Sequence, residues 1–403
     1  MARSFLSKTA GQLARSVDQA FALTALNPPR AMRRSSPAES LGHAQRMRGL
    51  AAIRAFYVRD EFMSRHNALL PVSEPISPSV KRVKTLGREG EVVDLRWRSN
   101  FEPLWTKAAV AERLGQLTEA ERSELQLGEQ AGAGALDGML RELGIDKSGE
   151  LRDKYLAVEG NRFGYARWLR HARGPRHCLV VLHGYMGGPY ALEERMWPVR
   201  KLFDSGLDVV FSVLPFHGAR RSQKRGFLPP AFPSSDPRFT IEGFRQLVLD
   251  HRALFEYLRH SGVASIGVMG MSLGGYAASL LATLEEQLSC AVLFIPLAAI
   301  DDFAHANGRM VGSALEQEQQ REALRRAQWP VSPLARPSLV DPRKVIVLAG
   351  ESDLVTGLGH AQRLTHHFHA PLVTFEGGHL LHFGKSRAFE PVFELLSREE
   401  LIR

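Results

Sequence analysis

A serine flanked by glycines lies at residues 270–274, where the sequence reads Gly270-Met271-Ser272-Leu273-Gly274. The apolar run Ile266–Met269 comes directly before it, and the helical pattern of Gly275–Glu285 follows it. A serine between a strand and a helix sits on a very tight turn, and glycines two residues to either side remove the side chains that would clash there. The turn raises the hydroxyl above the sheet and leaves the amide of Leu273 free at a helix N-terminus. The pattern therefore predicts that Ser272 is a nucleophile.

A serine hydroxyl is a poor nucleophile until a base removes its proton. Two later segments hold candidate partners: Glu351-Ser352-Asp353 follows the apolar run Lys344–Gly350, and Gly377-Gly378-His379 follows Leu372–Phe375. Together with the serine turn, these segments resemble the α/β-hydrolase superfamily, in which an acid after a later strand and a histidine near the end follow the serine. The resemblance extends from about residue 90 to the C-terminus. It implies that His379 is the base and that Asp353 orients it.

Other side chains compete for these two roles. His382 lies three residues after His379 and could lie on the same helical turn, so it is an alternative base. Glu351 and the pair Asp301 and Asp302, which follow the preceding strand, are alternatives to Asp353 as the acid.

Negative charge that develops on a substrate oxygen needs donors that are already in place. The segment His183-Gly184-Tyr185-Met186-Gly187-Gly188 follows the first continuous apolar strand, and the resemblance makes it the oxyanion loop. The amide of Tyr185 would then act beside that of Leu273, with the amide of Met186 as the alternative to Tyr185. His183 itself precedes a glycine in a way that indicates a structural role.

Leu214-Pro215-Phe216-His217-Gly218 resembles a scaffolding turn that many members of the same superfamily carry after the next strand. We expect a structural role for His217 as well. The basic cluster that follows, Ala219–Arg225, is expected to be a solvated loop, and contact with an anionic group is the alternative.

Strands and helices alternate from Cys178 onward. Continuous apolar strands that alternate with helices predict an α/β fold with a mostly parallel, doubly wound sheet covered on both faces. Upstream, Val93, Leu95 and Trp97 alternate with polar residues, as on a half-buried strand. The strand candidates in the later part are Cys178–His183, Asp208–Val213, Ser265–Met269, Ala291–Ile295, Lys344–Ala349 and Leu372–Phe375.

The chain is expected to divide into a basic, helical N-terminal extension, residues 1–85, and an α/β-hydrolase domain, residues 86–403. Two segments interrupt the strand–helix alternation of that domain. One is a helical insertion at about residues 105–157, ahead of the strand-like Arg162–Arg170. The other, at about residues 298–341, follows the strand Ala291–Ile295, where relatives often carry a lid. A lid over the pocket is the interpretation that we favour for it, and a helical excursion on the surface is the alternative.

The net charge of +9 is concentrated at the start of the chain. Residues 1–58 hold nine Lys and Arg against two acidic residues, while the remainder is close to balanced, which argues against a nucleic-acid-binding core. No run of 18 apolar residues occurs, and no compact apolar stretch follows Arg3 and Lys8, so neither a transmembrane helix nor a signal peptide is expected.

The two cysteines, Cys178 and Cys290, lie in apolar runs and are expected to be reduced. No metal-ligand spacing or phosphate loop is recognisable, so no metal and no cofactor are expected.

Residues 4–26 place Leu6, Ala10, Leu13, Val17 and Phe21 at helical spacing. Asn27-Pro28-Pro29 ends that helix, and a stretch rich in Pro, Ser and Arg continues to about Ser40. Three interpretations remain open. The helix packs on its own domain or on a second subunit, it lies on a membrane surface, or it is part of an organelle transit peptide.

These features predict a serine hydrolase that cleaves a carboxylic ester, a thioester or an amide through an acyl-enzyme on Ser272, acting on a small-molecule or lipid acyl substrate. An acyltransferase that uses the same serine is one alternative. A noncatalytic homologue that binds a membrane or a partner is the other. The expected location is the cytoplasm, with residues 1–26 as the candidate for peripheral membrane contact.

If residues 1–26 bind membranes, the intact chain should co-sediment with anionic vesicles at low salt and should be released at high salt, because each basic residue near such a surface contributes about 1 kcal/mol. A chain that begins near Leu41 should lose this binding and keep its activity on soluble esters. If the shortened chain instead unfolds, or an oligomer dissociates, the helix is a packing element and the membrane interpretation is wrong.

Overall fold

The computed structural model describes residues 2–22, 41–64, 66–72, 74–127, 148–173, 176–223 and 229–402. Within these ranges, nine strands form one sheet in the order β1-β2-β3-β5-β4-β6-β7-β8-β9. The strands are β1 (Ser79–Leu86), β2 (Gly90–Arg98), β3 (Phe163–His171), β4 (Arg176–Leu182), β5 (Leu207–Ser212), β6 (Val263–Met271), β7 (Leu288–Phe294), β8 (Val345–Gly350) and β9 (Leu372–Phe375).

Strands β4 to β9 pair in parallel, and β1, β2 and β3 join them through antiparallel pairs. The prediction of a mostly parallel sheet is therefore confirmed, and each predicted apolar run from Cys178 onward overlaps a strand of that part. The central strands are buried almost throughout, because helices cover both faces of the sheet. Cys178 and Cys290 are buried and free, as expected for reduced cysteines.

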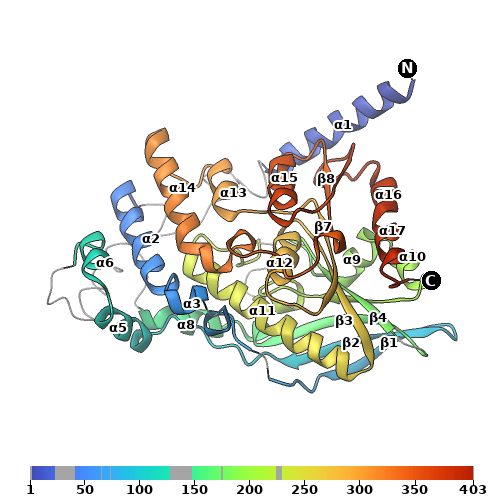
Figure 1. Cartoon of the computed structure of the whole chain (residues 1–403), viewed down its shortest axis with the longest axis horizontal. Coiled ribbons are helices and arrows are strands. Elements are labelled where there is room, and N and C mark those ends of the chain that lie inside the picture. Colours follow the sequence, from blue (N-terminus) through green and yellow to red (C-terminus); the bar gives the residue numbers. More distant parts are fainter. Residues whose placement is uncertain are drawn as a thin grey trace.

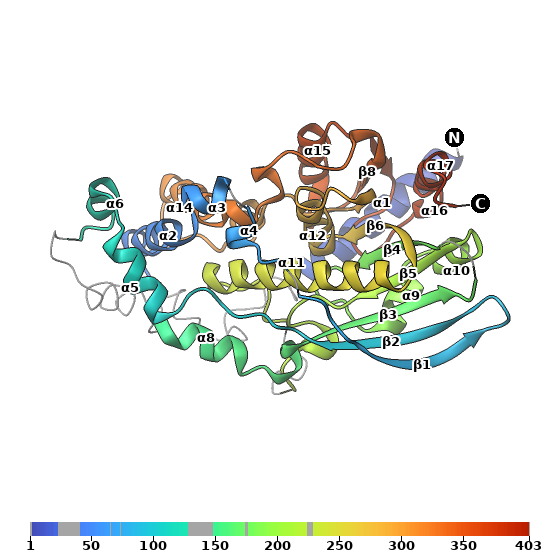
Figure 2. The same ribbon diagram turned by 60° about the horizontal axis from the view of Figure 1, so that its bottom comes forward.

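One edge of the sheet is the hairpin of β1 and β2 (Figure 2). The alternation predicted on β2 is present, since Val93, Leu95 and Trp97 are buried and Arg96 is exposed. Strand β1 was not predicted. Its residues are exposed on both faces, so no apolar period marks it in the sequence.

The helices lie on both sides of the sheet (Figure 1). Residues of α11 and α12 belong to one apolar core, and residues of α10 and α17 belong to the other. The helices are α1 (Ala2–Phe21), α2 (His43–Tyr57), α3 (Asp60–Ser64), α4 (His66–Leu69), α5 (Lys107–Gly115), α6 (Glu119–Glu124), α8 (Ser148–Leu156), α9 (Tyr190–Met196), α10 (Val199–Asp204), α11 (Pro237–His260), α12 (Leu273–Ala282), α13 (Ile300–Ala306), α14 (Ala314–Gln328), α15 (Gly357–Phe368), α16 (Lys385–Ala388) and α17 (Glu390–Arg398). Short 3-10 turns cover Glu159–Arg162 (η4), Gly218–Arg220 (η5), Trp329–Val331 (η7), Pro333–Ala335 (η8) and Pro342–Lys344 (η9).

The segment between β2 and β3 contains α5, α6 and α8, although the two strands pair directly with each other. Residues 128–147 of this segment lie outside the described residues. Within the part that is described, the helices extend from the body at the end that carries α2 (Figure 2). The segment thus leaves the sheet after Arg98 and returns to it at Phe163.

The segment 298–341 forms α13 and α14, and α14 packs along α2 from the N-terminal part of the chain (Figure 1). Gln320 Nε2 lies 3.1 Å from His43 Nδ1, and Arg46 donates to the carbonyl of Arg309 at 2.8 Å. The following 3-10 turns contact α12, where Tyr276 donates its hydroxyl proton to the carbonyl of Val331 at 3.1 Å. This segment is therefore packed on the helix that follows Ser272.

Helix α1 begins within the expected N-terminal segment, and Asn27-Pro28-Pro29 and the stretch to Ser40 lie outside the described residues. The face of α1 that touches the protein coincides with the predicted apolar stripe only in part, since Ala10, Val17 and Phe21 are half-buried. Ala14 and Asp18 are fully buried, whereas Leu13 is 52% exposed. Of the helices in the described ranges, none combines the length and the apolar character that crossing a bilayer requires.

Candidate active site

Ser272 lies between β6 and α12 with a backbone φ of 55° and ψ of −113°. A non-glycine residue rarely adopts a positive φ, and such a conformation persists only when the surrounding structure enforces it. The flanking glycines make the turn possible. A Cβ on Gly270 would lie 2.0 Å from the carbonyl oxygen of Gly274, and a Cβ on Gly274 would lie 2.1 Å from that of Leu182. Ser272 thus occupies the strand–turn–helix position that its sequence pattern predicts.

Backbone hydrogen bonds fix this turn against the end of β7. The amide of Ser272 donates to the carbonyl of Phe294 at 3.1 Å. Its own carbonyl accepts from the amides of Tyr276 at 3.0 Å and Leu297 at 3.1 Å. The serine is 7% exposed, so its position is set by protein contacts on most sides.

His379 and Asp353 form a buried pair. His379 Nδ1 lies 2.9 Å from Asp353 Oδ2, and the two residues come from the loops after β9 and β8. The amides of Val355 and Thr356 donate to Asp353 Oδ1 at 2.8 and 2.9 Å. Burial opposes ionisation of this carboxyl group, but His379, the Thr356 hydroxyl and these amides outweigh it and hold the pKa of Asp353 well below its usual range. Asp353 is therefore ionised, and its carboxylate can accept a hydrogen bond from Nδ1 of His379.

Thr356 is a site residue that the sequence analysis missed. Its hydroxyl lies 2.8 Å from Asp353 Oδ2, 3.4 Å from His379 Nδ1 and 3.2 Å from the carbonyl of Ile295. Ile295 directly follows β7, whose last residue, Phe294, accepts the amide proton of Ser272. The pair and the serine are thus anchored to the same strand end. Among the described residues, no hydrogen bond joins the Ser272 hydroxyl to His379, and catalytic hydrogen bonds are often long before substrate binds.

The loop that follows β4 lies against Ser272. A Cβ on Gly184 would lie 3.5 Å from Ser272 Cβ, and the amide of Gly187 donates to the carbonyl of Gly184 at 3.0 Å to close a turn. Leu273 is the first residue of α12, so its amide has no acceptor within the helix. These positions are compatible with the predicted donors Tyr185 and Leu273, which remain a prediction.

Met186, the predicted alternative to Tyr185, has a φ of 71° and is 40% exposed. Tyr185 directs its hydroxyl to the carbonyl of Pro230 at 3.3 Å. The choice between the two amides also remains a prediction.

His183 has a structural role in this loop. Its Nε2 accepts the amide proton of Leu214 at 3.0 Å, so Nδ1 carries the proton and donates to the carbonyl of Gly184 at 2.8 Å. Burial lowers the pKa of His183, in keeping with a neutral ring. On the other side, Glu193 accepts the amide proton of Gly188 at 3.0 Å.

Sheet order and site together define the architecture. Strand β5 inserts between β3 and β4, β6 leads into the serine turn, and the acid and the histidine follow β8 and β9 in that order. This is the arrangement in which a nucleophile turn lies at the carboxyl edge of a doubly wound sheet. The chain has the α/β-hydrolase fold. The resemblance seen in the sequence is thereby confirmed at the level of the fold.

No protein-family model matches this chain. Two proteins of Mycobacterium tuberculosis, from strains CDC 1551 and H37Rv, are each 36% identical to it over 234 residues, and both are described as uncharacterized. The match covers 56% of this chain and 55% of each relative, so the chain spans about half the length of the curated relatives it matches.

Among solved structures, an acetyl xylan esterase from Paenibacillus sp. R4 is similar with a TM-score of 0.49 and 14% identity, over 84% of this chain and 95% of that one. Acetyl xylan esterase 1 from Thermoanaerobacterium sp. JW/SL YS485 has a TM-score of 0.48 and 12% identity, over 86% and 97% of the two chains. An esterase from Pyrococcus furiosus has a TM-score of 0.39 and 18% identity, over 59% and 87%.

The alternative base, His382, and the alternative acids have other hydrogen-bond and ion-pair partners than His379 and Asp353. His382 Nε2 donates to the carbonyl of His379 at 2.7 Å, and burial lowers the pKa of His382 to about 4. Glu351 accepts the hydroxyl proton of Thr374 at 2.9 Å. Asp302 pairs with Arg321 and Arg363, and Arg321 also lies 3.9 Å from Asp301. Of the acids proposed from the sequence, Asp353 is the one whose carboxylate contacts the ring of His379.

A cavity of about 650 Å³ lies between α2, α14 and α15. Arginines line it together with apolar residues and Glu322, and Ser272, Asp353 and His379 are not among its lining residues. The arginines have carboxylate partners: Arg54 pairs with Glu124, Arg325 and Arg326 with Glu322, and Arg321 and Arg363 with Asp302. In the part of the chain that the structure describes, no group of three or more His, Cys, Asp or Glu side chains is arranged to hold a metal ion.

The turn Leu214–Gly218 supports the loop that carries Gly188. A Cβ on Gly188 would lie 3.1 Å from the amide nitrogen of Gly218, so the two backbones touch. His217 is fully buried, donates from Nδ1 to the carbonyl of Pro215 at 2.8 Å, and has a pKa far below its usual value because of its burial. The structural role expected for His217 fits these contacts.

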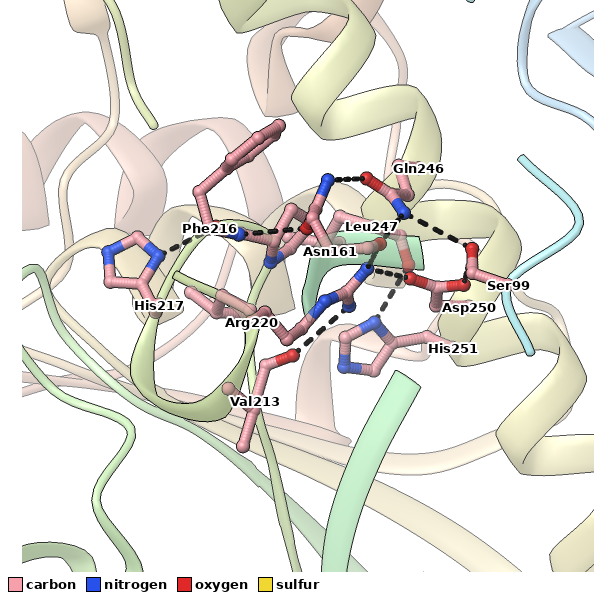
Figure 3. A network of polar contacts seen from close by, with 12 residues as sticks. Ser99, Asn161, Val213, Phe216, His217, Arg220, Gln246, Leu247, Asp250 and His251 are labelled. Carbon is pink, nitrogen blue, oxygen red and sulfur yellow. Dashed lines mark hydrogen bonds and ion pairs between the residues drawn. The ribbon is translucent and has the colours of Figure 1, made fainter. Parts of the chain in front are cut away.

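A buried network of polar side chains holds the turn Leu214–Gly218 in place (Figure 3). Arg220 Nη2 lies 2.7 Å from Asp250 Oδ2, and Arg220 Nη1 donates to the carbonyl of Val213 at 3.2 Å. Asp250 Oδ1 also accepts the hydroxyl proton of Ser99 at 2.6 Å. Part of the basic cluster thus proves to be internal, since Arg220 is 1% exposed, while residues 224 and 225 lie outside the described residues.

Asn161 and Gln246 extend the network to two further elements. Asn161 Oδ1 accepts the amide proton of Phe216 at 2.9 Å, and its side-chain amide donates to Gln246 Oε1 at 2.8 Å. Tyr155 donates to the same Gln246 oxygen at 2.9 Å. The network therefore connects α8 and α11 to the turn that supports the loop beside Ser272.

Replacing Asp250 with alanine leaves the guanidinium of Arg220 buried without its ion partner, so Asp250→Ala should destabilise the protein by about 3–5 kcal/mol. Urea unfolding followed by circular dichroism measures the loss. The matched control is Asp204→Ala, which removes the exposed partner of Arg200 and should leave the urea midpoint unchanged. An equal, small effect of both changes would contradict a stabilising role for the network.

Proposed function

We propose that the protein is a serine hydrolase that cleaves a carboxylic ester, or a thioester or amide, through an acyl-enzyme on Ser272. The observation that supports it most directly is the buried contact of His379 Nδ1 with Asp353 Oδ2 at 2.9 Å. An ionised carboxylate at Nδ1 leaves Nε2 of the ring as the acceptor for a proton. His379 therefore has a free acceptor at Nε2, and its loop is anchored to the same strand end as the turn of Ser272. A histidine in this position is suited to general-base catalysis.

The proposed reaction has two halves. In the first, His379 Nε2 takes the proton of Ser272 Oγ while that oxygen bonds to the substrate carbonyl carbon, and the carbonyl oxygen becomes an oxyanion. Amide donors at Tyr185 and Leu273 would stabilise this charge, with one such donor worth roughly 10²–10³ in rate. The leaving alcohol, thiol or amine then receives the proton from His379, and the acyl group stays on Ser272.

In the second half, His379 takes a proton from water, whose oxygen attacks the acyl carbon, and returns it to Ser272 Oγ as the acid product leaves. An acyltransferase would follow the same steps with an alcohol or a thiol in place of water. Analysis of products formed with such acceptors separates the two activities. Hydrolysis is the function we favour, because it needs no second binding site for an acceptor.

Ser272→Ala should abolish labelling by a fluorophosphonate probe and lower ester turnover by about 10⁶, since it removes the nucleophile. His379→Ala should be about as damaging, because the two residues act as one unit. His382→Ala is the control, and it should keep roughly a tenth or more of the activity because Ser272, His379 and Asp353 are all retained. Persistent labelling of Ser272→Ala would refute the nucleophile, and the reverse order of the two histidines would move the base to His382.

Asp353→Asn should lower turnover by about 10⁴ and leave the fold intact, because an amide group favours the wrong tautomer of His379. Steady-state kinetics on a soluble ester, with circular dichroism of the same sample, measures both effects. Asp302→Asn is the matched control, since Asp302 contacts arginines instead of the histidine. If Asp301→Asn or Asp302→Asn alone reduced turnover in this way, the acid would follow the earlier strand.

A further inference from the structure

Helix α1 docks on the two loops that carry Asp353 and His379. In Figure 1 its N-terminal end projects beyond the body of the protein. The contact is close: a Cβ on Gly378 would lie 2.6 Å from Asp18 Oδ2 and 3.1 Å from Ala14 Cβ. A Cβ on Gly11 would lie 2.9 Å from the hydroxyl oxygen of Ser352. Small residues on both sides therefore allow the helix to approach the main chain of these loops.

The side chain of Asp18 completes this contact. Its Oδ2 accepts the amide proton of His379 at 2.7 Å and that of Leu354 at 3.2 Å, and its Oδ1 accepts the amide proton of Leu380 at 3.0 Å. Leu354 directly follows Asp353. One carboxylate thus joins the backbone of the proposed base to the backbone beside the proposed acid.

Burying a carboxylate is costly unless charge-assisted hydrogen bonds satisfy it. Asp18 is fully buried, so its three amide donors are needed to keep it there, and the same bonds fix where those amides lie. A helix that only needed to dock would bury its apolar side chains. Here Leu13 is exposed, and one of the two fully buried residues described in α1 is an acid.

We propose that Asp18 is a positioning residue for the hydrolase reaction: it holds the loops of His379 and Asp353 at the separation that lets the imidazole serve Ser272. This inference rests on the proposed function. Asp18 acts through the backbone and does not touch the reacting atoms. A displacement of about 1 Å at such a site can lower the rate by about 10². The N-terminal helix is accordingly part of the active-site architecture, and a chain that begins near Leu41 should lose turnover, contrary to the expectation from sequence.

The test compares Asp18→Ala, Asp18→Asn and the matched control Leu13→Ala in the full-length chain. Asp18→Ala should lower kcat, and the rate of fluorophosphonate labelling of Ser272, by about 10² with KM within about threefold of the wild-type value. Asp18→Asn should recover part of this loss, because its amide oxygen can still accept the protons of His379 and Leu354. Leu13→Ala changes an exposed position of the same helix and should behave as the wild-type protein.

Amide hydrogen exchange detected by mass spectrometry measures the contact without relying on activity. Peptides that contain His379 and Leu354 should exchange faster in Asp18→Ala than in Leu13→Ala. Faster exchange with unchanged labelling would overturn the positioning role, and so would equal losses in Asp18→Asn and Asp18→Ala, which would point to the charge alone. A wild-type chain that the probe does not label would refute the proposed function itself.

Discussion

Ser272 occupies a backbone conformation that costs on the order of 1–3 kcal/mol for a residue with a side chain. Its surroundings leave it no alternative, because Gly270 and Gly274 touch each other and the end of β4 at distances that no Cβ could share. The parallel strands on either side, the helix that begins at Leu273 and the hydrogen bond from the Ser272 amide to the carbonyl of Phe294 all hold the turn in place. The position of Ser272 therefore depends on the strands, the helix and the loops that surround this turn.

Buried polar groups also hold the loops around this turn in place. Asp353, Asp18 and Asp250 are three buried carboxylates, and each has a different set of partners. Asp353 contacts an imidazole, a hydroxyl and backbone amides, Asp18 contacts backbone amides, and Asp250 contacts a guanidinium and a hydroxyl. Each set of partners fixes a loop at the carboxyl edge of the sheet. Apolar packing alone would leave such loops free to slide, since it has little directional preference. Hydrogen bonds and ion pairs give the edge its geometry.

Local pattern was sufficient to predict the serine turn and the strands from β4 to β9, because continuous apolar runs and glycine spacing are properties of neighbouring residues. The order of Ser272, Asp353 and His379 came from the resemblance to a known superfamily, and the structure places the last two in contact.

Strand β1 could not be predicted, since both of its faces are exposed. Thr356 and Asp18 could not be predicted either. A threonine after a turn and an acid on a basic helix are common, and the residue that both contact, His379, lies 23 and 361 residues from them. Leu13 was predicted to lie on the apolar stripe of α1 but is exposed, because a helix rich in small residues can dock through a face with little apolar area.

The bond between Asp18 and His379 connects two positions separated by 361 residues in a chain of 403. Synthesis on the ribosome proceeds from the N-terminus, so α1 emerges long before the loop that it supports. Before that loop is made, Asp18 has no His379 amide to bind. A chain that stops ahead of residue 379 would therefore lack this contact even if most of its sheet had assembled.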